Sequence, residues 1–303
     1  WGAVPGAPGL GAILVGALAA YVTAPLVAFL GRGGGWARYP TAAFRLWVVR
    51  PVLYAQLLLP VVAGAGALGL AVGAPFGHAL VAGRVAAAGA LAVAAVVLVA
   101  GWLGSRRLVV RDVEAHVPDL PAAFDGLRVV QLSDLHVGPH TSRRFLARVA
   151  RTARALAPDL IVATGDLVDD RAEDVEPFAA WLRTLEAPGA GAPALGVWLI
   201  PGNHDVYAGW SVVAAGLRRL TGARLLVNEA HVLRRGGASL ALLGTGDPAG
   251  RGRGPLAGEG AEGAAPDLGR AFARVPADVP ILAFAHNPAL WPALAERGVA
   301  LTL

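Results

Sequence analysis

The sequence predicts N-terminal transmembrane α-helices followed by a layered α/β domain, and three observations support this fold class. Residues 1–107 contain seven Arg and no Asp or Glu, whereas residues 108–303 contain nineteen Arg and all twenty-one acids. Uncharged segments that are apolar throughout and of transmembrane length occur only in the first part. Short apolar runs that end in polar residues occur only in the second part. We therefore predict a membrane domain at 1–107 and a second domain at 108–303.

Three segments of the first part are uncharged and have transmembrane length: 10–30, 51–72 and 85–103. Each has about the twenty residues needed to cross a hydrocarbon core of about 30 Å. Buried core helices of soluble proteins are usually shorter and carry a polar stripe, which these segments lack. A signal peptide would explain the first segment only. The sequence thus predicts about three membrane-spanning helices, with the lipid bilayer as a partner.

The arginines that flank these segments are distributed unevenly. The loop before the second segment and the stretch after the third contain seven: Arg32, Arg38, Arg45, Arg50, Arg106, Arg107 and Arg111. The link "GAPFGH" between the second and third segments contains none. By the positive-inside rule, the second domain lies on the cytoplasmic side of a multi-pass inner-membrane protein. The pI near 10.5 then reflects the arginines that flank the membrane segments, so we expect no nucleic-acid partner.

The second domain alternates buried strands with amphipathic helices. Five apolar runs that end in polar residues predict strands: 127–134, 158–166, 194–205, 239–247 and 279–286. Helical spacing of apolar residues predicts helices within 142–157 and 173–186. This alternation predicts covered sheets in an α/β domain, and the hairpin-like "HVLRRGGASLALL" indicates that one sheet is partly antiparallel.

Residues 248–266, "PAGRGRGPLAGEGAEGAAP", are rich in Gly, Pro and Ala. Long stretches of this composition are typical of mobile loops. We expect a surface insertion here, in preference to a lid over a substrate.

Polar side chains that suit metal binding follow four of the predicted strands. They stand in the motifs "SDLH", "GDLVD", "GNHD" and "AHNP": Asp134, His136, Asp166, Asp169, Asn203, His204, Asp205 and His286. Ligands of open α/β sheets bind beyond the carboxyl ends of the strands, so these residues are expected to converge. Carboxylate, imidazole and amide groups suit Mn²⁺, Fe, Zn²⁺ or Ni²⁺, and the absence of Cys excludes thiolate ligands. The number of groups suits two metals that share a bridging ligand.

The order of these motifs, D-x-H, G-D-x-x-D, G-N-H-[D/E] and a later His, resembles the calcineurin-like metallophosphoesterase family. The resemblance covers about residues 125–303. The apolar N-terminal region further resembles the membrane-anchored bacterial branch of that family. The resemblance implies a β-sandwich flanked by helices, with two divalent metal ions as cofactors.

The resemblance also implies a role for each side chain of the motifs. Five would be metal ligands: Asp134, His136, Asp166, Asn203 and His286. The first two would hold one metal, the last two the other, and Asp166 would bridge both. His204 would stay free of metal and protonate the leaving oxygen. Asp169 would orient the ring of His204, and Asp205 would support the site without binding a metal.

These roles describe a membrane-anchored phosphoesterase whose nucleophile is a metal-activated hydroxide. The substrate would be a phosphomonoester, a phosphodiester or a pyrophosphate, and the tether beside the bilayer favours a lipid-linked one. Two alternatives remain open: a membrane scaffold or sensor with a degenerate phosphoesterase domain, and a cyclic nucleotide phosphodiesterase or nuclease. The net charge of −2 over residues 108–303 disfavours nucleic acid.

The chain departs from the family pattern at its last residues. The family motif G-H-x-H would supply one more His to each metal, but the chain stops at "GVALTL", which is typical of the strand before that motif. We therefore expect a fragment truncated at its C-terminus, with weak metal loading and little or no turnover.

Overall fold

The computed structural model describes residues 17, 19–21, 23–24, 47, 50–252 and 260–303, and it divides the chain into two compact units. These units are Trp1–Val110 and Arg111–Leu303. Most of the predicted span 10–30 lies outside the described residues, as do Arg32, Arg38 and Arg45.

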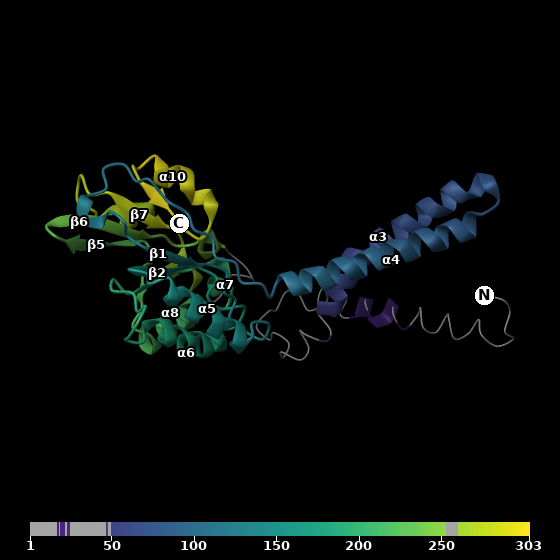
Figure 1. The fold of residues 1–303 in the computed structure, drawn as a ribbon, viewed down its shortest axis with the longest axis horizontal. Helices are drawn as coiled ribbons and strands as arrows, with labels where there is room; N and C mark the ends of the chain where they lie inside the picture. The colour runs from purple at the N-terminus through teal and green to yellow at the C-terminus, as the bar shows by residue number, and fades with distance from the viewer. Residues whose placement is uncertain (1–16, 18, 22, 25–46, 48–49, 253–259) are drawn as a thin grey trace. The chain divides into compact units, whose positions relative to one another are not determined.

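The first unit contains two long apolar helices, α3 (Arg50–Gly73) and α4 (Ala79–Gly104), joined by the short helix η3 (Ala74–Phe76) (Figure 1). They pack side by side through small residues, because a Cβ atom on Gly69 would lie only 2.5 Å from the Ala82 carbonyl oxygen. Most of their large apolar side chains are exposed, such as Leu57 at 70 %. By length and composition both helices could cross a membrane.

The second unit contains two four-stranded sheets. The first sheet is parallel, in the order β1 (Val129–Leu132), β2 (Leu160–Thr164), β3 (Val197–Ile200) and β4 (Arg224–Leu225). The second has the order β5 (Glu229–Arg235), β6 (Ala238–Gly244), β7 (Ile281–Phe284) and β8 (Leu301–Thr302). Among the described strands of this sheet, β5 and β6 pair antiparallel and the other neighbours pair parallel. The predicted mixed sheet and the strand predicted within "GVALTL" are confirmed.

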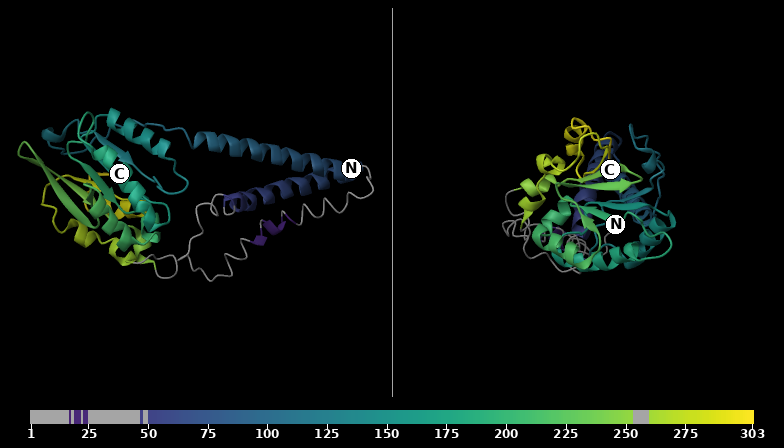
Figure 2. Two further views of the ribbon diagram at one scale, coloured as in Figure 1. Left: turned by 90° about the horizontal axis from the view of Figure 1, so that it is seen from below. Right: turned by 90° about the vertical axis from the view of Figure 1, so that its left-hand side faces the viewer.

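The two sheets pack face to face around one apolar core (Figure 2). Buried side chains from both sheets form it: Leu160, Val162, Trp198, Ile200, Leu233, Leu240, Leu242, Leu282 and Phe284. Alternate residues of each strand point into this layer, as the period of two in a strand requires. The implied β-sandwich is therefore present.

Helices cover the outer faces of the sandwich. The first sheet is covered by α5 (Arg143–Ala155), α6 (Val175–Glu186) and α8 (Trp210–Leu220) (Figure 1). The outer face of the second sheet packs against α9 (Leu268–Phe272) and α10 (Trp291–Ala295). α5 begins where the Ser142 hydroxyl accepts a hydrogen bond from the Phe145 N–H, which caps the helix.

The structure differs from the sequence prediction in the segment 248–266. Its two ends are ordered as the short helices η6 (Pro248–Arg251) and η7 (Ala261–Ala264). Gly250 is buried, and a Cβ atom there would lie 2.3 Å from the backbone nitrogen of Ala265. The mobile-loop prediction is wrong for these ends, because small residues allow the backbone to pack closely; residues 253–259 lie outside the described part.

Leu242 is fully buried between the sheets, whereas Leu156 at the end of α5 is 39 % exposed. We expect Leu242→Ala to lower the free energy of unfolding by about 2–5 kcal/mol, because it leaves a cavity in the core. The matched change Leu156→Ala is expected to cost less than about 1 kcal/mol. Urea unfolding followed by tryptophan fluorescence measures both, and equal losses would contradict the core assignment.

Candidate metal centre

The loops after β1 and β2 run side by side and bring three predicted ligands together. The Asp134 N–H donates to the Gly165 carbonyl at 3.2 Å, and the His136 N–H donates to the Asp166 carbonyl at 2.9 Å. These backbone bonds extend the pairing of the two strands beyond their ends. They fix Asp134 and His136 beside Asp166 before any side chain is considered.

The same three residues have left-handed backbone conformations. The φ angle is 54° at Asp134, 41° at His136 and 51° at Asp166. Such angles are uncommon for residues other than glycine and cost of order 1 kcal/mol or more each. Strained backbone of this kind clusters at functional sites, where it aims side chains that a relaxed loop would turn away.

Two glycines allow the loops to approach closely. A Cβ atom on Gly202 would lie 2.2 Å from the backbone nitrogen of Asp166, and one on Gly165 would lie 2.7 Å from Nδ1 of His286. The glycine of "GNHD" is therefore needed for close approach, as its place before Asn203 suggested. The short helix α7 (Asn203–Tyr207) begins directly after it.

The Asp205 carboxylate joins α7 to the loop after β2. It is fully buried and accepts hydrogen bonds from the backbone N–H groups of Leu167, Val168 and Gly202, at 2.9–3.2 Å. Burial raises its pKa to about 7, and the bonds from Val168 and Gly202 act in the opposite direction. Asp205 thus holds the loops that carry the site, which gives a structural basis to the supporting position predicted for it.

Asp166 lies at the centre of the candidate site. One of its oxygens, Oδ2, is 3.4 Å from Nε2 of His136, and the other, Oδ1, is 3.4 Å from Nε2 of His286. The ligand atoms of Asp134, Asp166 and His286 lie within 4.8 Å of one another, and so do those of His136, Asp166 and His204. The two oxygens of one carboxylate therefore face different histidines, as a ligand shared by two cations would.

Asn203 and His286 lie on the same side of Asp166. The Oδ1 atom of Asn203 is 3.2 Å from Nε2 of His286, whose other ring nitrogen lies 2.8 Å from the carbonyl oxygen of Thr164. A carbonyl can only accept, so Nδ1 of His286 carries the hydrogen in this bond. The oxygens of Asn203 and Asp166 that face Nε2 also accept only, so this nitrogen carries a hydrogen as well and must lose it before it can bind a metal.

His204 is held through Nδ1 by Asp169, the residue predicted to orient it, and by Asp170. Its Nδ1 atom is 2.8 Å from the carbonyl oxygen of Asp169 and 3.0 Å from Oδ1 of Asp170. The Asp169 carboxylate lies 3.7 Å from Nδ1 of His136. Sequence reasoning missed Asp170, although its place directly after the G-D-x-x-D motif was a signal for it. The ring of His204 also makes an edge contact with that of His136, with centroids 4.5 Å apart.

The carboxylates give the site a negative electrostatic potential, which suits a cation. The hydrogen bond to Asp170 raises the pKa of His204 to about 9, although burial acts in the opposite direction. Burial also opposes the charge of His286, yet the contact with Asp166 raises the pKa of that ring to about 9. The imidazoles thus attract protons to balance the carboxylates. The oxygen and nitrogen donors and this charge fit divalent metal ions.

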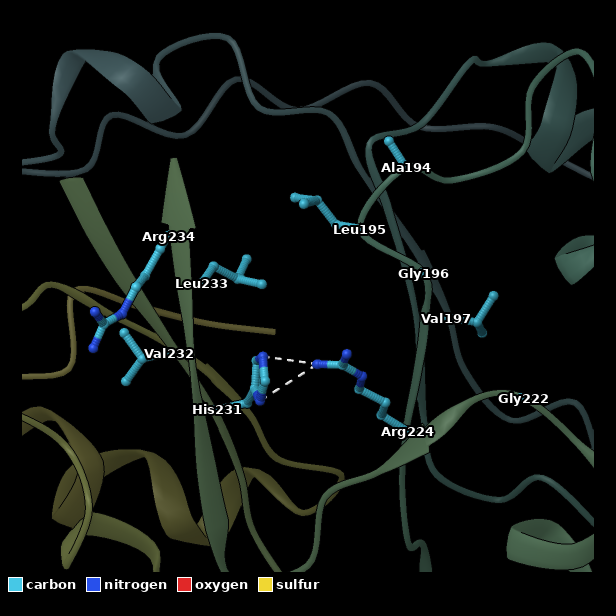
Figure 3. Close-up of a pocket in the computed structure, with 10 residues that line it drawn as sticks. All are labelled: Ala194, Leu195, Gly196, Val197, Gly222, Arg224, His231, Val232, Leu233 and Arg234. Atoms are coloured by element: carbon cyan, nitrogen blue, oxygen red, sulfur yellow. Dashed lines mark hydrogen bonds between the residues drawn. The ribbon is translucent and has the colours of Figure 1, made fainter. Parts of the chain in front are cut away.

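A separate cleft of about 410 Å³ lies between β5 and the strands β3 and β4. Figure 3 shows Arg224 and His231 pointing toward one another inside it, with Nη1 of Arg224 2.7 Å from Nε2 of His231. None of the predicted site residues lines this cleft. It opens beside residues 194–197, at the start of β3, whereas Asn203 and His204 follow the carboxyl end of that strand.

Fold and site together define a class: α/β sandwiches that gather carboxylates and imidazoles at the ends of their strands. Residues 127–245 match the family described as "Calcineurin-like phosphoesterase", and the chain carries a domain of that family. The resemblance seen in the sequence motifs is thereby confirmed. Members of this family normally bind divalent metals, in agreement with the donor set.

Curated relatives share this domain. The chain is 38 % identical over 103 residues to a "Transmembrane protein with metallophosphoesterase domain" from Danio rerio, which covers 33 % of the chain and 22 % of the relative. It is 40 % identical over 91 residues to the "UDP-2,3-diacylglucosamine pyrophosphatase LpxG" of Chlamydia trachomatis; this match covers 30 % of the chain and 26 % of the relative. An uncharacterized metallophosphoesterase of Campylobacter jejuni is 29 % identical over 161 residues; this match covers 53 % of the chain and 37 % of the relative. The chain thus spans well under half the length of these relatives.

The role of Asp205 can be tested by removing its carboxylate. Asp205→Ala leaves three backbone N–H groups in a dry interior without an acceptor, so we expect the free energy of unfolding to fall by about 3 kcal/mol or more. Glu176→Ala removes an exposed carboxylate from the first turn of α6 and should cost less than about 1 kcal/mol. Urea unfolding measures the difference, and a loss for Asp205→Ala as small as for Glu176→Ala would refute this role.

Proposed function

We propose that this protein is a metal-dependent phosphoester hydrolase with a dinuclear centre. The observation that carries the proposal is the position of Asp166, whose two oxygens face different histidines at 3.4 Å. Asp134 and His136 would hold the metal on one side, and Asn203 and His286 the metal on the other. When bound, two divalent ions lower the pKa of a water and neutralise charge on the phosphoryl oxygens.

His204 would supply the proton that the leaving oxygen needs. Its Nδ1 atom is held by the Asp169 carbonyl and the Asp170 carboxylate, so Nε2 is the nitrogen that can transfer a proton. The two contacts fix the tautomer and the orientation of the ring, as the carboxylate does in other histidine-based sites. Asp170 therefore shares the orienting role predicted for Asp169.

We further propose that α3 and α4 span a membrane and that the hydrolase domain is cytoplasmic. The helices have the required length and apolar surface, and the positive-inside rule sets the orientation. A relative from Danio rerio is named a transmembrane protein, and the Chlamydia trachomatis relative is named for a lipid-bearing pyrophosphate substrate. These names and the tether support a lipid-linked phosphoester or pyrophosphate as the substrate class.

Hydrolysis of bis(p-nitrophenyl) phosphate with Mn²⁺, measured on the protein encoded by the complete gene, tests the catalytic assignment. His204→Ala should lower the rate by about 100-fold or more, as expected for the loss of a general acid, while Mn²⁺ still binds. Asp166→Ala should abolish both binding and activity. His231→Ala removes a histidine of the separate cleft and should change neither. Full activity in the His204→Ala protein would refute the general-acid role.

Single cysteines can test the proposed topology, since the chain contains no Cys. His78 lies in the link between α3 and α4, and Asp125 lies in the second unit; both are exposed. In intact cells, a membrane-impermeant maleimide should label His78→Cys and leave Asp125→Cys unlabelled until the cells are broken. Labelling of Asp125→Cys in intact cells would place the hydrolase domain outside the cytoplasm.

A further inference from the structure

Asp247 lies near the candidate metal centre, although no role was assigned to it. It follows β6, which pairs with β7, the strand that leads to His286. The pairing continues past the strands, because the Thr245 N–H donates to the Phe284 carbonyl at 3.1 Å. Asp247 and His286 each come two residues after this pair. Both therefore lie at the end of the second sheet that carries the site.

The side chain of Asp247 is buried and only half satisfied. It is 1 % exposed, and its Oδ1 atom accepts a hydrogen bond from the Ala249 N–H at 2.8 Å, which caps η6. The Oδ2 atom has no hydrogen-bond partner among the residues that the structure describes. A buried carboxylate oxygen without a donor is costly and needs an explanation.

By contrast, the polar side chain of Asn228, beside Asp247, has hydrogen-bond partners for both its oxygen and its nitrogen. The buried side chain of Asn228 accepts from the backbone N–H groups of Gly246 and Asp267 and donates to the Ala265 carbonyl. The segment around Asp247 is therefore well packed and hydrogen-bonded, and its unused oxygen is not the result of a loose loop.

The helix beside Asp247 begins with a partly exposed amide donor. η6, which Asp247 caps, packs against α7, and α7 begins with Asn203. The Oδ1 atom of Asn203 faces His286, while no acceptor for its Nδ2 group is found in the described part of the chain. Burial raises the pKa of Asp247, and the charges of His286 and Asp166 also act on it, so its carboxyl is within electrostatic reach of the site.

We propose that Asp247 is a positioning residue for Asn203. Its free carboxylate oxygen accepts the amide N–H of Asn203 through one water, and keeps Oδ1 of Asn203 turned toward the metal position that it shares with His286. The inference rests on the proposed function, because it assigns a support to one ligand of that centre. Outer hydrogen bonds of this kind typically change metal affinity by about 10–100-fold.

The variant Asp247→Asn separates this role from helix capping. Asparagine caps helices as well as aspartate does, and its oxygen would stay with the Ala249 N–H. Its NH₂ group would then replace the free oxygen and turn an acceptor for Asn203 into a second donor. Asp267→Asn is the matched control, because Asp267 also caps a short helix and carries the same charge.

Calorimetric titration of the protein encoded by the complete gene, in detergent and with Mn²⁺, gives a readout that does not depend on activity. We expect Asp247→Asn to weaken Mn²⁺ binding by about 10-fold or more and Asp267→Asn to leave it unchanged. Asn203→Asp should also bind weakly, because two carboxylates would then face each other. The double variant Asn203→Asp with Asp247→Asn should recover affinity, since a donor again faces an acceptor.

The outcomes separate the two proposals. If the wild-type protein binds Mn²⁺ and Asp247→Asn binds it equally well, the positioning role is overturned while the metal centre stands. The same conclusion follows if Asn203→Asp binds more tightly and the double variant does not improve on it. If the wild-type protein binds no Mn²⁺ at all, the proposed metal centre fails, and the role of Asp247 fails with it.

Discussion

The buried carboxylate of Asp205 is the interaction on which the geometry of the site depends. Its hydrogen bonds reach the loop after β2 and the turn after β3, so one side chain fixes two ligand-bearing segments. With those segments held, the backbone N–H of His204 reaches Oδ1 of Asp166 at 2.8 Å. Hydrogen bonds to the backbone thus hold the segments that carry the candidate ligands.

The sandwich supplies the rest of the rigidity. Most of the candidate ligands follow strands of the first sheet, whereas His286 follows β7 of the second. The distance between His286 and Asp166 therefore depends on how the two sheets pack, and that packing is set by apolar side chains such as Phe284 and Ile200. Core and site are coupled for this reason, and a change between the sheets would move one half of the ligand set against the other.

The sequence was sufficient to predict the parts of the fold and site that follow from a local residue pattern. Apolar runs that end in carboxylates, amides and imidazoles predicted the strands and the convergence of their ends. It was insufficient where the outcome depends on tertiary contacts. β4 has only two residues, 224 and 225, too few to show a pattern. The order of η6 and η7 depends on close packing of glycines, and the contact of Asp170 with His204 depends on how a loop turns.

The left-handed backbone at Asp134, His136 and Asp166 has a consequence for evolution. Glycine would adopt each conformation with less strain, so selection for stability alone would favour replacing the ligands. Retaining a carboxylate or an imidazole there opposes that tendency, as expected where activity and stability compete. Descendants under selection for stability alone should therefore lose these three residues early, often to glycine or asparagine, while Asp205, which accepts hydrogen bonds from three backbone N–H groups, persists.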